Sequence, residues 1–140
     1  MKKLTLLLLI IISVFISCKN EIVFKNNEKD IKKTEYYTTK AYQLMMNNYL
    51  ILSEYCENEN EKNGFIKSIK LRDGLLGKML DAKISNKNAI RIERNDSIIV
   101  EYVAELNVFY EKANTYEKIK FKKINKNKIK LISYQFNIIN

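Results

Sequence analysis

The chain has 140 residues, with 25 basic and 16 acidic side chains and a formal net charge of +9. This length is enough for one domain with a single hydrophobic core. The absence of histidine excludes histidine-based triads and histidine metal sites, and three glycines and two cysteines are too few for a glycine-rich phosphate loop or a cysteine zinc site. We therefore expect no metal, no cofactor and no catalytic residues.

The first segment has the pattern of an export signal. Lys2 and Lys3 precede Leu4–Ser17, a run of 14 residues without charge. A helix that spans a bilayer needs about 20 apolar residues. The run is therefore too short to cross comfortably, but it fits the apolar region of a signal peptide over residues 1–17.

The end of this run resembles the lipobox of bacterial lipoproteins. Ile16, Ser17 and Cys18 fit that motif, whereas Phe15 stands where leucine is usual. The resemblance implies cleavage between Ser17 and Cys18, a diacylglycerol on the Cys18 thiol and a fatty acid on the new amino group. Two or three acyl chains anchor a protein firmly to a membrane. The alternative is a plain secreted or membrane-anchored protein with an incidental cysteine.

The residues after Cys18 bear on the location of the domain. Lys19 does not resemble the acidic signal for retention at the inner membrane, and no run of acids resembles a signal for export to the cell surface. We expect an outer-membrane lipoprotein with its domain on the periplasmic face. Without the signal the net charge is +7, which indicates a solvated basic surface or contact with anionic lipid, and we expect no nucleic-acid partner.

A long amphipathic helix is predicted after a polar tether over residues 18–33. Apolar residues recur at steps of three and four between Tyr37 and Cys56. This stripe is interpreted as a core face, although Tyr37 and Met45, together with Tyr102 further along, could line a pocket. Cys56 has no partner if Cys18 carries lipid, so it is either a buried thiol or half of an intermolecular bridge.

Residues 57–64 are expected to connect this helix to a short second helix that begins near Phe65. Gly74 and Gly77 mark a turn into extended chain. The remainder has the alternation of β-strands, most clearly over Ile98–Tyr110, where the even positions are all uncharged. Turns every ten to fourteen residues predict an antiparallel meander of three or four strands.

A helix followed by such a sheet predicts a single α+β domain over residues 34–140, with the long N-terminal helix packed on the sheet. The pattern resembles the cystatin-like or ketosteroid-isomerase-like fold and small bacterial envelope domains. The stretches that carry the resemblance are Ala41–Leu52, Arg72–Gly77, Glu101–Lys122 and Lys130–Phe136.

Three functions follow as hypotheses. The leading one is a non-catalytic, membrane-anchored envelope module that binds a protein or a small ligand. The second is an immunity or hydrolase-inhibitor lipoprotein. The third is a small isomerase-like enzyme, which the fold resemblance implies and for which Asp73, Asp81 and Tyr102 are the candidate residues.

Overall fold

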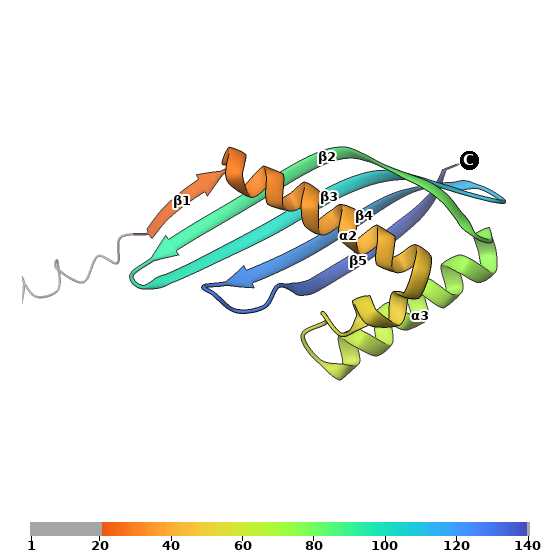
Figure 1. Cartoon of the computed structure of the whole chain (residues 1–140), viewed down its shortest axis with the longest axis horizontal. Helices are drawn as coiled ribbons and strands as arrows, with labels where there is room; N and C mark the ends of the chain where they lie inside the picture. Colours follow the sequence, from red (N-terminus) through yellow and green to blue (C-terminus); the bar gives the residue numbers. More distant parts are fainter. Residues whose placement is uncertain (1–20, 140) are drawn as a thin grey trace, which may run out of the picture.

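The computed structural model describes residues 21–139, and within them the chain forms an α+β domain. Two helices pack on one antiparallel sheet of five strands, which lie in the order β1-β2-β3-β4-β5. Figure 1 shows α2 crossing the face of the sheet and α3 lying beside its β5 edge. The elements in chain order are β1 (Glu21–Lys25), α2 (Glu28–Ser53), α3 (Glu59–Leu76), β2 (Met79–Arg94), β3 (Ser97–Tyr110), β4 (Asn114–Ile124) and β5 (Lys130–Ile139).

Strand β1 differs from the expected tether over residues 18–33. Glu21–Lys25 pairs with the last residues of β2, so that Val23 lies opposite Ile92 and Glu21 opposite Arg94. Its centre, Ile-Val-Phe, consists of residues with high strand propensity. The described sheet therefore includes Glu21–Lys25, ahead of the expected boundary at 34, and residues 18–20 lie outside the described part.

The passage from β1 into α2 depends on two asparagines. Asn26 has a φ of 53°, and its backbone N–H donates to the carbonyl of Ala89 at 2.8 Å. Asn27 then caps the helix, because its side chain accepts a hydrogen bond from the N–H of Lys29 at 3.0 Å. A left-handed asparagine and a cap together reverse the chain within two residues.

Helix α2 confirms the predicted long helix but is kinked at Asn48, where φ is −159° and ψ is 87°. The Asn48 side chain accepts a hydrogen bond from the N–H of Leu50 and so acts as an N-cap for the helical turns that follow the kink. Between Tyr37 and Cys56, where the apolar stripe was predicted, Ala41 is buried, Tyr37 is half-buried and Asn48 is exposed. The buried face is more polar than expected, since it includes Thr34 and Thr38.

Helix α3 is longer than the short helix expected near Phe65. It starts at Glu59, where the side chain of Asn58 accepts from the N–H of Glu61 at 3.0 Å, so most of the expected connector is helical. Gly74 lies inside the helix. Gly77 ends it with a φ of 77°, a conformation that favours glycine.

The strands confirm the predicted alternation most clearly in β3. Val100, Tyr102, Leu106 and Val108 are buried against the helices, whereas Glu105 faces away and pairs with Lys118 at 3.3 Å. Turns at Asn95 and Asn125, both with positive φ, close the hairpins at one end of the sheet.

Strand β5 departs from the predicted alternation. Strict alternation would place Ile132, Tyr134 and Phe136 on one face, but Lys120 lies opposite Ser133 and Phe121 opposite Leu131. Ile132 is thus the extra residue of a β-bulge, and Leu131 takes the core position with 2% exposure.

Cys56 is a free, buried thiol, as one of the two interpretations predicted, and it forms an isolated parallel bridge with Leu131. Burial raises the pKa of the Cys56 thiol above its usual value, so the reactive thiolate is disfavoured. None of the helices in residues 21–139 has the length and apolar character needed to cross a membrane.

Candidate functional site

A buried carboxylate is the most unusual group in the described interior. Thr115, Glu117, Ile119 and Phe121 alternate along β4 with the exposed or half-exposed residues between them. All four therefore point to the helix-covered face of the sheet. Glu117 has an exposed fraction of 0%, so its charge is removed from water.

Four hydroxyl groups surround the Glu117 carboxylate. The phenol of Tyr110 and the hydroxyl of Thr115 donate to Oε1 at 2.6 and 2.8 Å. The phenols of Tyr42 and Tyr134 donate to Oε2, each at 2.7 Å. These residues come from α2, β3, β4 and β5, so the carboxylate joins the helix to three strands.

Arg72 extends this network to α3. Its side chain is 1% exposed; Nη1 donates to the Tyr134 hydroxyl at 2.8 Å, and Nε and Nη2 donate to Asp73 at 2.9 and 2.7 Å. The guanidinium also lies 5.2 Å from the ring centre of Tyr110. Arg72 supplies the positive charge that a buried carboxylate needs nearby, although a tyrosine stands between them.

The arrangement is suited to holding charge rather than to moving a proton. Each carboxylate oxygen of Glu117 already accepts two short hydrogen bonds. Burial, followed by the negative charge of Glu117, raises the pKa of Tyr42 well above its usual value. These phenols therefore stay protonated, and their protons are directed at the carboxylate.

A buried ion pair fixes the start of α2. Arg91 of β2 donates to both oxygens of Asp30, at 2.8 and 2.7 Å, and Asp30 is 1% exposed. Nearby, the hydroxyls of Thr38 and Tyr102 are buried without a hydrogen-bond partner in the described part of the chain. A hydroxyl buried without a partner lowers the free energy of unfolding by about 1–3 kcal/mol, so these two groups reduce the stability of the domain.

The residues proposed as pocket lining occupy different places. Tyr37 lines a small cavity of about 160 Å³ between α2 and the sheet, together with Tyr55 and Phe121. Met45 and Tyr102 are buried in the core, and the Tyr102 ring packs edge-on against Tyr37 with centroids 5.2 Å apart. Ser17 and Cys18 lie outside the described residues.

The carboxylates proposed for an enzyme are not brought together by the contacts described. Asp73 binds Arg72, and Asp81 accepts from the N–H of Ala82 at 2.8 Å on exposed chain. Sequence reasoning missed Glu117 as the buried acid. The signal was present, because Glu117 shares its alternation with Ile119 and Phe121, but a charged residue on a strand is usually assigned to water.

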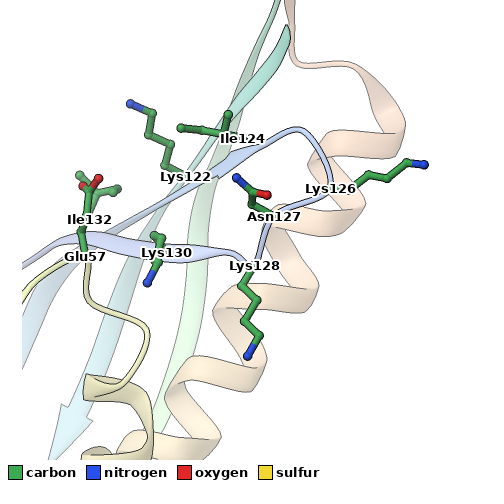
Figure 2. Close-up of a pocket in the computed structure, with 8 residues that line it drawn as sticks. All are labelled: Glu57, Lys122, Ile124, Lys126, Asn127, Lys128, Lys130 and Ile132. Atoms are coloured by element: carbon green, nitrogen blue, oxygen red, sulfur yellow. The ribbon is translucent and has the colours of Figure 1, made fainter. Parts of the chain in front are cut away.

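In contrast to this closed interior, the surface of the domain carries a basic depression. It lies at the turn between β4 and β5, has a volume of about 540 Å³ and is lined by Glu57, Lys122, Ile124, Lys126, Asn127, Lys128, Lys130 and Ile132. Figure 2 shows Lys126 and Lys128 extending from the turn in different directions. The lysines therefore spread positive charge over a surface instead of converging on one point.

Comparison with protein-family models, curated proteins and solved structures finds no match to this chain. No group of three or more metal-ligating side chains occurs within residues 21–139. The functional argument therefore depends on the residues themselves.

Proposed function

We propose that the chain is a membrane-anchored bacterial lipoprotein whose domain acts by binding a component of the cell envelope. The observation that carries the proposal is the succession, in the sequence, of Lys2 and Lys3, the uncharged run Leu4–Ser17 and then Cys18. The thiol of Cys18 receives the lipid and becomes the first residue of the mature protein. The domain lies at the outer membrane, on its periplasmic face.

Binding is favoured over catalysis by the way the interior is used. The fold belongs, in this proposal, to the cystatin-like or ketosteroid-isomerase-like group, in which a helix and a curved sheet enclose a cone. In this chain Glu117 and its four hydroxyl donors occupy that interior and satisfy one another. What remains for a partner is the outside of the domain and the small cavity beside Tyr37.

Metabolic labelling with a fatty-acid analogue tests the anchor. We expect label on the wild-type chain and none on Cys18→Ser, because serine lacks the nucleophilic thiol. Cys56→Ser is the matched control and should keep the label, since the Cys56 thiol is buried in the domain. Equal labelling of wild type and Cys18→Ser would overturn the assignment.

Capture from solubilised envelope tests the binding role. We expect the anchored chain to retain one component in stoichiometric amount, and failure to retain any would count against it. Retention of a hydrolase or a toxin whose activity then falls would instead establish the inhibitor or immunity function.

An isomerase-like enzyme is the competing candidate, and Glu117 is the observation that favours it. A buried carboxylate beside phenols is the kind of group such enzymes use. Here the phenols donate to the carboxylate rather than to a substrate. Binding of a hydrophobic enolate analogue by wild type but not by Glu117→Gln, with both variants folded, would support catalysis over the binding role.

A further inference from the structure

The end of the sheet where the described chain begins combines exposed aliphatic residues with unpaired lysines. In the strand register, Glu21 lies opposite Arg94 at the β2–β3 turn, and Ile99 of β3 lies opposite Ile124 beside the β4–β5 turn. The start of β1 and both turns are thus at one end, as Figure 1 also shows. Neighbouring strands are about 4.8 Å apart, so β1 and β5 are separated by about 20 Å.

An aliphatic row crosses four strands at this end. Val23 lies opposite Ile92, Ile92 opposite Ile99, and Ile99 opposite Ile124. Directly opposed residues point to the same side of a sheet. Because Val100, the neighbour of Ile99, faces the helices, the aliphatic row faces the opposite side, and Val23 and Ile124 are 46% and 38% exposed.

Lysines flank the row on the β5 side. The segment 122–130 contains no acid and five lysines, of which Lys123 lies opposite Val100 and therefore faces the helix side. The other four are used by none of the ion pairs found in residues 21–139: Lys122, Lys126, Lys128 and Lys130. We call these four residues the lysine hairpin. Acids at the same end are Glu57 in the depression, Glu93 paired with Arg91, Glu101 opposite Lys122 and paired with Lys120, Glu21 in β1 and Asp96 in the β2–β3 turn.

We propose that the aliphatic row and the lysine hairpin form a docking surface for an anionic phospholipid bilayer. Exposed aliphatic side chains next to lysines suit the boundary between acyl chains and headgroups. The spread of Lys126 and Lys128 in Figure 2 matches a plane of phosphates better than a single anion. The bilayer is the occupant because the chain enters the sheet at this end.

The short stretch of chain between Cys18 and Glu21 places this surface at the membrane. The inference rests on the proposed lipidation of Cys18, which lies only three residues before Glu21. Three residues span at most about 10 Å when fully extended. A lipid on Cys18 therefore holds the start of β1 next to the headgroups, and the rest of that end follows because it belongs to the same sheet.

Fluorescence quenching in vesicles tests the docking, because the chain has no tryptophan. Ile124→Trp places one probe in the aliphatic row, and Leu75→Trp, 51% exposed at its leucine on α3, is the matched control. Each full-length lipidated protein is added to preformed vesicles of brominated phosphatidylglycerol and phosphatidylcholine in equal parts. We expect strong quenching at position 124 and little at position 75. Equal quenching at the two positions would overturn the proposal.

The contact between the lysines and anionic lipid is tested by the rate at which a membrane-impermeant reagent modifies their amines. Mass spectrometry measures this rate for each residue. Lys126, Lys128 and Lys130 should react at least about threefold more slowly on these vesicles than on phosphatidylcholine alone, since anionic headgroups attract basic side chains near the membrane surface. Exposed Lys67, Lys70 and Lys112 should not change. Salt of about 1 M should remove the difference, because the Debye length falls to about 3 Å.

The outcomes separate this inference from the proposed function. A chain that does not float with the vesicles lacks its anchor, which contradicts the lipoprotein. A chain that floats without quenching at position 124, or with equal lysine rates on both lipids, contradicts only the docking surface. Protection that appears without lipid as protein concentration rises would assign the surface to a second copy of the chain and overturn the proposal.

Discussion

At the scale of single residues, the interior is organised around one charge. Glu117 accepts hydrogen bonds from Tyr42, Tyr110, Thr115 and Tyr134, and these residues reach it from four different elements. Hydrogen bonds to a charged group stabilise a protein by more than neutral ones. Removing one donor leaves the buried carboxylate partly unsatisfied, so this cluster should be sensitive to small changes.

Two tyrosine-to-phenylalanine substitutions should therefore have opposite effects. Tyr42→Phe removes a donor to Glu117 and should lower the free energy of unfolding by about 1.5–3 kcal/mol. Tyr102→Phe removes a hydroxyl that is buried without a partner, and should leave stability unchanged or raise it by about 1 kcal/mol. Urea titrations of both variants measure the difference. Similar losses in the two would mean that Tyr102 has a bonding role absent from this description.

Alkaline pH should destabilise the domain through the same tyrosines. Burial, followed by the charges of Asp30 and Tyr37, raises the pKa of Tyr102 to about 12. In the unfolded chain tyrosine titrates near 10, so above that pH the unfolded state binds fewer protons than the folded state. The contribution of Tyr102 to the free energy of unfolding is complete below about pH 10 and is lost as pH rises towards 12. Urea midpoints at about pH 8 and 11 should differ less in Tyr102→Phe than in wild type; an identical difference would contradict the assignment.

At the scale of elements, β3 contributes more buried apolar side chains than any other described helix or strand. Leu106 is 1% exposed, so Leu106→Ala should lower the free energy of unfolding by about 2–5 kcal/mol. Its neighbour Glu105 makes a partly exposed ion pair with Lys118 at 3.3 Å, so Glu105→Ala should cost less than about 1 kcal/mol. Denaturant unfolding would show the reverse order only if the strand were shifted by one residue.

The elements also show what the sequence could predict. Strand β3 was predictable because thirteen residues alternate with period two, and a long helix was predictable from its spacing of apolar residues. Strand β1 was not, since five residues are too few to show a period and polar residues surround them. The alternation with Ile119 and Phe121 indicates that Glu117 points inward, but the partners that satisfy its charge lie up to 75 residues away, Tyr42 among them, and no local pattern reveals them.

At the scale of the whole molecule, β1 changes the relation between anchor and domain. A tether over residues 18–33 would have allowed the domain to move well away from the membrane. With Glu21 already in the sheet, only Cys18 and two following residues separate the lipid from the fold. The orientation of the lipidated protein is then set by the sheet, with the β3–β4 turn and Lys112 at the end away from the membrane.

This geometry determines how the membrane face should be measured. Protease would have poor access to the start of β1, which is held within about 10 Å of the lipid, whereas a small amine reagent reaches any exposed lysine. Lys67, Lys70 and Lys112 are exposed, and they lie on α3 and at the far turn. With a reagent that cannot cross the outer membrane, we expect no modification of these lysines on intact cells and full modification after that membrane is permeabilised. Modification on intact cells would place the domain on the cell surface and contradict the periplasmic assignment, while leaving the anchor at Cys18 and the docking surface to their own tests.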